Sequence, residues 1–385
     1  MPEAHTTPPL ERDLLVAEAQ RRAGLDDLGD TWFFEPLDKL LEVEKRESQL
    51  HEAGTKAEAE RIVGYLVNRL GRVDLLKKHP EILDEQVNVG CAIISLGRTG
   101  STKTHRMLAA SPNHAFLKWW EGMFPYPFPG EEIGHPVQRR ALAQSIHDRI
   151  PKRPEVRVTE MDDADEEAYL IDQSFVGTMI ECFLWVPGFI EWQNTYDQIK
   201  GYEELKVTLQ ILQWQDPSRR GKRWILKSPT HMSAPRALLQ AFPDSLMVQT
   251  HRHPLRTVPS HCSMITPLIR SKTDAISVEE IGRFTSKRWA DMAADLIDLR
   301  DEIGDDRFID IPYDTTTQDP LRACRDVYDR MGARWTPEDE AAIQNWLDNN
   351  KREKWSPHIY DYEKHGLSEE IIEQDYARYI ARHCS

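Results

Sequence analysis

The chain of 385 residues is 40% hydrophobic and 29% charged, which is the balance of an ordinary globular protein. Its formal net charge of −15 argues against a nucleic-acid binder, because contacts to phosphate backbones need a basic face. No apolar run is long enough to cross a bilayer, residues 1–10 lack the apolar centre of a signal peptide, and the five cysteines form no CxxC pair. We therefore expect a cytoplasmic protein with reduced thiols, no membrane span and no nucleic-acid partner.

The pattern of residues 11–82 is typical of helices. Apolar residues recur at spacings of three and four, and Ile62, Leu66 and Leu70 share one helical face. Charged residues fill the other faces, without a cluster of reactive side chains. We predict a helical N-terminal layer over residues 1–86 that takes no part in chemistry.

Four short apolar segments have the composition of strands: residues 87–96, 224–226, 245–250 and 308–311. The first is too continuously apolar for a sheet with one wet face. Helical patterns fall between and after these segments, at residues 169–183, 202–215, 231–242, 277–303, 321–331 and 336–349. The alternation predicts an α/β fold, with a P-loop-like parallel sheet of about four or five strands flanked by helices. The acidic stretch 155–167 is expected to be exposed.

A polar loop follows the first predicted strand, at residues 97–102. Its glycines and small hydroxyl residues allow successive backbone N–H groups to form an anion-binding nest, and the next helix adds the partial positive charge of its N-terminus. Arg98 and Lys103 supply full charges. The loop is not a Walker A motif, since only two residues separate Gly97 from Gly100. Taken alone, the loop is equally compatible with a plain turn.

Two more polar clusters follow later strands. Lys227, in Lys-Ser-Pro, ends the second strand, and Arg252 ends the third, with Ser260 eight residues further on in a helix. A strand-end lysine is often a solvated surface residue, whereas arginine binds phosphate as a planar fork. In an open parallel sheet, ligands bind beyond the carboxyl ends of the strands, so the three clusters should converge there.

Together these clusters resemble the sulfotransferases that use 3′-phosphoadenosine 5′-phosphosulfate (PAPS). The resemblance is to a branch with many bacterial enzymes and, more distantly, to tyrosylprotein sulfotransferases. It spans roughly residues 27–379 and rests on these segments: GRTGSTKTHRMLAASP, RWILKSPTHM, FPDSLMVQTHRHPLRTVPS, IDIPYDTTTQDP and HIYDYEKHGL. It implies an α/β core over residues 87–355, with an acceptor-site insertion near 113–215 and a C-terminal segment, 356–385, packing on the core.

The resemblance also assigns roles to residues. The 5′-phosphosulfate would lie on Arg98, Thr99, Gly100, Ser101 and Thr102. Arg252 and Ser260 would hold the 3′-phosphate, Lys227 would approach the sulfuryl group, and Tyr313 would contact the adenine. Lys351, Arg352 and Lys354 form a basic segment that could close over the nucleotide. Two positions depart from the branch: His253 replaces a common aspartate, and Asp314 with Thr315 replaces the usual acidic residues after Tyr313.

Sulfuryl transfer to a hydroxyl needs a group that takes the acceptor proton. In the branch that the chain resembles, a glutamate soon after the phosphosulfate loop has this role, and Glu121 matches it. Trp119 and Trp120 beside it could desolvate the carboxylate. His105 and His231 are rival candidates. The spacing of histidines and cysteines suggests no metal site, and the chemistry requires none.

Aromatic residues suggest a hydrophobic acceptor, such as an alcohol, sterol, lipid or phenol. We expect its pocket to use Trp119, Phe124, Tyr126 and Phe128 together with residues 183–192, although the same residues could be plain core. The partner is thus a small hydroxylated molecule, and a homo-oligomer is possible. A P-loop kinase or NTPase would need a Walker A motif and an aspartate-ended strand for magnesium, which the sequence lacks. A non-catalytic nucleotide-binding protein is the other alternative.

Overall fold

A five-stranded parallel sheet forms the centre of the computed structural model, which describes residues 7–150, 159–350 and 361–384. Its strand order is β2-β3-β1-β4-β5. The strands are β1 (Asn88–Ile93), β2 (His114–Ala115), β3 (Arg223–Lys227), β4 (Leu246–His251) and β5 (Phe308–Pro312). The predicted parallel sheet is confirmed. Strand β2 was missed because two residues are too few to carry a periodic pattern.

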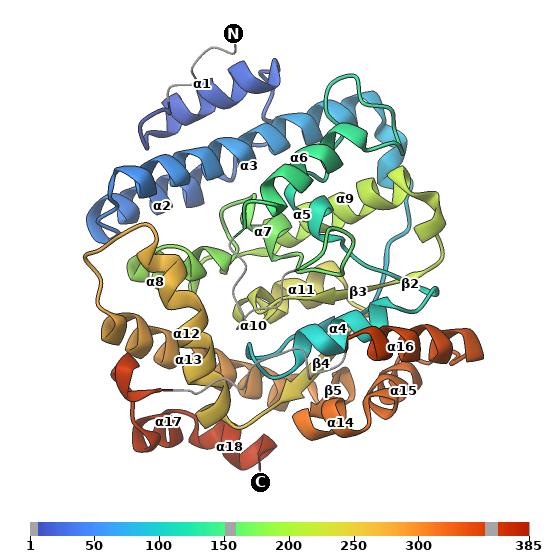
Figure 1. Ribbon diagram of the computed structural model, residues 1–385. Coiled ribbons are helices and arrows are strands. Elements are labelled where there is room, and N and C mark those ends of the chain that lie inside the picture. The colour runs from blue at the N-terminus through green and yellow to red at the C-terminus, as the bar shows by residue number, and fades with distance from the viewer. Residues whose placement is uncertain (1–6, 151–158, 351–360, 385) are drawn as a thin grey trace.

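The two faces of the sheet bury different side chains, as the continuous apolar character of β1 predicts. Ala92 packs in a core under α9, α11, α12 and α13, whereas Cys91 and Ile93 pack in a second core under α4, α15 and α16 (Figure 1). The bounds of these helices are α4 (Ser101–Ala109), α9 (Ile199–Gln215), α11 (Pro235–Ala241), α12 (Pro254–Arg270), α13 (Val278–Ile303), α15 (Pro320–Arg330) and α16 (Pro337–Asn349). Helices on both faces leave the carboxyl ends of the strands as the open edge.

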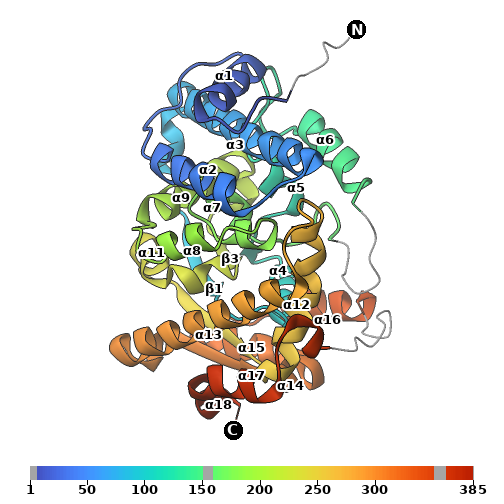
Figure 2. The same cartoon turned by 90° about the vertical axis from the view of Figure 1, so that its left-hand side faces the viewer.

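The predicted N-terminal helices form a layer at one end of the molecule, far from the C-terminal helices (Figure 2). They are α1 (Arg12–Ala23), α2 (Phe34–Glu47), α3 (Glu52–Lys78) and a 3₁₀ turn, Pro80–Asp84. The helices share their own hydrophobic core, which reaches α8 (Pro187–Gln193). Arg69 and Arg72 each place a guanidinium nitrogen 2.7 Å from a carboxylate oxygen of Glu204 in α9, which ties this layer to the sheet.

Short helices connect β2 to α9: α5 (Trp119–Met123), α6 (Val137–His147), α7 (Ala168–Asp172), a 3₁₀ turn (Met179–Cys182) and α8 (Pro187–Gln193). The predicted helix over residues 169–183 is therefore wrong. The chain folds back after α7, with Phe175 at a φ of 60°. At Gly177 a Cβ atom would lie 1.7 Å from Asp172 Oδ1, so only glycine fits this reversal.

The remaining elements complete the layers around the sheet. They are α10 (Thr230–Ser233), α14 (Tyr313–Gln318), α17 (Glu369–Asp375), α18 (Ala377–His383) and 3₁₀ turns at Pro217–Arg219, Asp305–Arg307 and Glu363–His365. The Tyr376 hydroxyl donates to Ser286 O of α13 (2.8 Å), which fixes the C-terminal segment to the sheet helices. Among the helices of the described ranges, none has the length and apolar character of a membrane span.

Candidate active site

The loop between β1 and α4 has the backbone conformation that its sequence predicts. Arg98 has a φ of 66° and Gly100 a φ of 93°, so two residues in left-handed conformations bend the chain just before α4. For arginine this conformation is uncommon and needs support from its surroundings. A Cβ on Gly100 would lie 3.4 Å from the Tyr313 ring, so the loop and the start of α14 are in contact. The bend directs backbone N–H groups toward one region at the N-terminus of α4.

Three predicted cationic and hydroxyl groups meet at this loop. Arg98 Nε donates to Ser260 Oγ (3.0 Å), and Arg252 Nη1 donates to Arg98 O (3.2 Å). The Arg252 guanidinium lies over the Tyr313 ring, 4.2 Å from its centroid. The structure therefore brings together Arg98, Tyr313 and the pair Arg252 and Ser260, which come from three separate parts of the sequence. Two arginines at a helix N-terminus create a strongly anion-attracting site.

Thr99 has a different position from its loop neighbours. Its side chain is buried, and its hydroxyl bonds Leu96 O (2.7 Å) and the hydroxyl of Thr250 (2.6 Å). The hydroxyl thus joins β1 to the end of β4, and Thr99 can face a ligand only through its backbone. Lys103, one turn into α4, donates to Thr316 O (2.8 Å) and ties the loop helix to α14.

The end of β3 carries a second charged group. Lys227 pairs through Nζ with Glu166, and its backbone N–H donates to Glu167 (3.0 Å). The lysine side chain is 6% exposed and the Glu166 side chain 22%. Residues 155–167 were expected to be exposed, and that expectation is wrong for Glu167, which is fully buried. Neither Glu166 nor Glu167 was predicted as a site residue, because an acidic run alone does not show which of its members will lie against a strand end.

His231 lies in a buried chain of hydrogen bonds below this lysine. Its Nε2 bonds the Glu167 carboxylate, and its Nδ1 bonds the Tyr202 hydroxyl (2.9 Å). Burial alone would raise the pKa of Glu167, but the charge and hydrogen bond of His231 outweigh burial, so this pKa lies below its ordinary value. Both ring nitrogens of His231 are thus engaged inside the protein.

His105 is also enclosed. Its Nε2 lies 3.2 Å from Ile225 O, and burial lowers its pKa to about 4. A neutral imidazole in a packed helix is a poor candidate for contact with an acceptor. The structure therefore gives neither histidine an open face toward the loop.

Glu121 lies in a separate ion pair. Its Oε1 accepts from Arg219 Nη2 (2.5 Å), its Oε2 accepts from Lys118 N (3.0 Å), and both paired side chains are 6% exposed. Arg219 precedes β3 and stacks over Trp224, 5.3 Å from the ring centroid. Lys227 comes three residues after Trp224, which places it roughly 10 Å further along the strand at about 3.3 Å per residue. The contacts of Glu121 do not bring it to Lys227, and its predicted role as the base remains untested.

The aromatic residues of the predicted acceptor pocket divide into two groups. Trp119 and Phe124 belong to one small core, where Phe128 packs on Phe124 with ring centroids 5.6 Å apart, and Tyr126 bonds Thr208 (2.9 Å) in another. Four residues of the predicted stretch 183–192, in contrast, line a small cavity. Its walls are Leu184, Trp185, Val186, Ile190, Ile265, Ile269, Phe284 and Trp289, with Glu181, His261, Thr285 and Arg288 as the polar groups.

This cavity adjoins the loop through two side chains. The His261 ring packs on Trp289 with centroids 3.7 Å apart, and a Cβ on Gly97 would lie 2.6 Å from the Trp289 ring. Burial, with the charge of Arg98, lowers the pKa of His261 to about 3. Since His261 follows Ser260, the apolar cavity and the cationic loop are neighbours.

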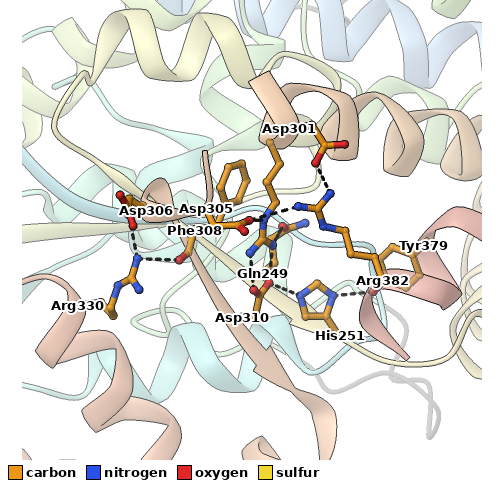
Figure 3. A network of polar contacts seen from close by, with 11 residues as sticks. Gln249, His251, Asp301, Asp305, Asp306, Phe308, Asp310, Arg330, Tyr379 and Arg382 are labelled. Carbon is orange, nitrogen blue, oxygen red and sulfur yellow. Dashed lines mark hydrogen bonds and ion pairs between the residues drawn. The ribbon is translucent and has the colours of Figure 1, made fainter. Parts of the chain in front are cut away.

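A polar network joins residues of β4, β5 and α18, among them His251, Asp310 and Tyr379 (Figure 3). His251 donates from Nε2 to Asp310 Oδ1 (2.7 Å). Arg300 donates from Nη1 and Nη2 to the two carboxylate oxygens of Asp310 (2.7 and 2.6 Å). His251 Nδ1 bonds the Tyr379 hydroxyl of α18 (3.1 Å). These contacts hold the end of β4, and therefore the backbone of Arg252, against β5 and the C-terminal helix.

The same network contains three potential metal ligands. The ligand atoms of His251, Asp310 and His383 lie within 4.8 Å of one another. The two rings stack with their planes 8° apart and their centroids 4.0 Å apart. Their in-plane lone pairs therefore lie in parallel planes and cannot meet at one ion, and Arg300 already occupies the carboxylate. The geometry is that of a structural ion-pair network.

The predicted basic segment Lys351, Arg352 and Lys354 lies outside the described residues.

Comparisons with known proteins agree with this arrangement. The model described as the sulfotransferase family matches residues 91–337. Sulfotransferase STF1 from Mycobacterium tuberculosis H37Rv is 27% identical, with a TM-score of 0.85 over 97% of this chain and 100% of that chain. Sulfotransferase STF9 from Mycobacterium avium has the same fold at 23% identity, with a TM-score of 0.87 over 99% of this chain and 98% of the other. A search of curated proteins gives no match.

Proposed function

Because the chain belongs to the sulfotransferase family, we propose that it transfers a sulfuryl group from PAPS to the hydroxyl of a hydrophobic small molecule. The products are a sulfate ester and adenosine 3′,5′-bisphosphate. The observation that carries the proposal is the meeting of Arg98, Arg252 and Ser260 around the bent loop before α4. Two arginines held beside one helix N-terminus match a donor with phosphate groups at both ends of its ribose.

The donor would lie along the carboxyl edge of β1, β3 and β4. The backbone from Thr99 to Thr102 and the Arg98 side chain would hold the 5′-phosphosulfate. Arg252 and Ser260 would hold the 3′-phosphate, and Tyr313, which already stacks on Arg252, would border the adenine. Binding would then replace the Arg98–Ser260 hydrogen bond with charge-assisted bonds to the two anionic groups.

Lys227 is the proposed cation at the reacting bond. As sulfuryl transfer proceeds, negative charge develops on the oxygen that bridges sulfur and the 5′-phosphate. An ammonium group held in a water-poor site stabilises such charge far better than water does. Displacement at sulfur resembles phosphoryl transfer in that positioning and charge neutralisation do most of the work. The residues proposed here supply both.

The proposed acceptor pocket lies at the small cavity between α12, α13 and α8, whose side chains would have to move apart to admit a lipid or sterol. Its walls are mostly apolar and include Trp185, Phe284 and Ile265, and it borders the loop through His261 and Trp289. Such walls favour a lipophilic alcohol, sterol, lipid or phenol over a sugar. We further propose that the protein works in the cytoplasm, because all five cysteines are free thiols, as is usual in a reducing compartment.

A panel of hydroxylated lipids, sterols and phenols tests the proposal directly. Each compound is incubated with the protein and radiolabelled PAPS, and labelled sulfate esters are separated from the donor. We expect transfer to at least one lipophilic compound and little to a hydrophilic sugar. A protein that binds neither PAPS nor adenosine 3′,5′-bisphosphate would contradict the proposed donor.

A further inference from the structure

The segment after residue 163 crosses the end of β3 and presents three acidic residues there. Asp165 N donates to Leu117 O (2.9 Å), and Ala164 forms an antiparallel bridge with Lys118. These bonds fix the backbone of the segment beside the chain that follows β2. The three carboxylates are therefore held in place at the edge where the sheet ends, rather than on a solvated loop.

Each of these carboxylates has a different environment. Glu167 is fully buried and bonded to His231 and to the backbone of Lys227. Burial, with the charge of Glu166, raises the pKa of Asp165 to about 7. Glu166 alone is both partly exposed and paired with the strand-end lysine, with 22% of its side chain accessible. It is the carboxylate that an incoming ligand can reach.

Glu121 differs from Glu166 on each of these points. Both of its oxygens accept hydrogen bonds from the protein, and only 6% of its side chain is exposed. The charges that act on it belong to Arg219, Arg139 and Arg140. An acceptor hydroxyl would have to displace an enclosed arginine to reach it.

We infer that Glu166 receives the acceptor proton, and that Lys227 holds this carboxylate until the donor binds. The inference rests on the proposed function. When the acceptor oxygen attacks, the new O–S bond forms as the bond between sulfur and the bridging phosphate oxygen breaks. The hydroxyl proton goes to the Glu166 carboxylate. The electron pair of the broken bond stays on the phosphate of adenosine 3′,5′-bisphosphate, next to Lys227 and Arg98.

An exchange of partners makes the two roles compatible. The phosphosulfate oxygens attract Lys227 away from Glu166. The Glu166 carboxylate then lies next to Asp165 without its cation. Loss of the cation makes a carboxylate a better proton acceptor. Tyr169 and Cys182 also lie near Glu166, and burial raises the pKa of each well above its ordinary value, so neither adds charge. Arg106, whose charge acts on the adjacent Asp165, pairs with Asp163 (3.1 Å). Donor binding thus prepares the base.

The first experiment compares Glu166→Gln with Glu160→Gln, an exposed glutamate earlier on the same segment. Transfer from radiolabelled PAPS is measured to dodecanol, to water as slow PAPS hydrolysis, and to 4-nitrophenol at a pH where this phenol is already ionised. We expect Glu166→Gln to slow transfer to dodecanol and water by about 10²- to 10⁴-fold, since general-base catalysis contributes that much. Transfer to the phenolate, which has no proton to lose, should fall much less.

The second experiment needs no acceptor. Removing the charge of Glu166 frees Lys227, so Glu166→Gln should bind PAPS several-fold more tightly than Glu160→Gln does, on the scale of one partly exposed ion pair. Adenosine 3′,5′-bisphosphate, which lacks the sulfuryl group, should show a smaller gain. Unchanged or weaker PAPS binding would contradict the exchange of partners.

The outcomes separate this inference from the proposed function. A wild-type protein that binds no PAPS defeats the proposed function itself. A wild-type protein that transfers sulfate, together with a Glu166→Gln variant that keeps near-normal rates on dodecanol, defeats only the assignment of Glu166. If Glu121→Gln then showed the 10²- to 10⁴-fold loss while remaining folded, the base would be Glu121.

Discussion

Two glutamate–cation pairs beside β3 look alike in sequence but differ in their surroundings. In the Glu121–Arg219 pair both side chains are 6% exposed, and the second oxygen of Glu121 caps the start of α5. In the Glu166–Lys227 pair the carboxylate is 22% exposed and lies at the carboxyl end of the strand. The enclosed pair therefore belongs to the core, whereas the partly exposed pair is placed to change partners.

The difference has an energetic basis. A buried ion pair contributes little net stability when intact, yet removal of one partner costs several kcal/mol because the other charge stays buried. A partly exposed pair loses less, since water replaces the missing partner. Breaking each pair in turn should therefore affect folding in one case and turnover in the other.

The largest expected effect is on folding, from Arg219→Ala. Glu121 would remain buried without its cation, so the free energy of unfolding should fall by about 3–5 kcal/mol. Urea denaturation measures this loss. Arg236 pairs with Glu302 on the surface, where the two side chains are 66% and 57% exposed, so Arg236→Ala should cost no more than about 1 kcal/mol. Equal losses for the two variants would mean that Glu121–Arg219 is not an enclosed pair.

The next effect is on turnover, from Lys227→Met. Loss of a cation at the developing charge should lower the transfer rate by about 10²- to 10³-fold. Stability should change by only about 1 kcal/mol, because Glu166 can be hydrated. Lys206→Met, on the exposed side of α9, is the matched control and should keep the wild-type rate. Normal turnover of Lys227→Met would reduce this lysine to a structural residue.

A third carboxylate, Asp172, extends the comparison to pH. Burial raises its pKa from 3.8 to about 7, so the folded protein holds a proton there that the unfolded chain releases above about pH 4. The stability that Asp172 contributes is therefore present at low pH and is lost as the pH rises from about 4 to 7. Asp172→Asn lacks this loss. Its free energy of unfolding relative to wild type should rise by on the order of 4 kcal/mol across that range.

Chemical denaturation at a series of pH values checks this prediction. The amide of asparagine can still accept the hydrogen bond that Met179 N donates to Asp172 Oδ1 (3.3 Å), so the turn before Gly177 should survive. A difference between variant and wild type that stays constant with pH would show that Asp172 ionises normally in the folded protein.

Much of the fold followed from local patterns. The apolar run of β1 and the strand–helix–strand unit from β3 to β4 predicted a parallel sheet, and the sheet is observed. The prediction of a helix over residues 169–183 was wrong, because helical propensity is a local property and does not show where the chain reverses direction. That reversal depends on a close approach of Gly177 to Asp172, which is a tertiary contact.

The sequence predicted part of the candidate site, but not the pairing of its lysine. The sequence indicated Arg98, Arg252 and Ser260, because the carboxyl ends of parallel strands meet at one edge, and the structure brings these residues into contact. It could not indicate that Glu166 lies against Lys227. The pair joins residues 61 positions apart, and an acidic run has the same pattern whether it is solvated or folded over a strand end.

The central claim, that the site binds a donor with a 3′-phosphate, is tested most directly by calorimetry with adenosine 3′,5′-bisphosphate and AMP. Charge-assisted hydrogen bonds from Arg252 and Ser260 should each contribute about 1.5–3 kcal/mol, so the bisphosphate should bind at least about 100-fold more tightly. Arg252→Met should remove most of this preference. Equal dissociation constants for the two nucleotides in the wild-type protein would contradict the account.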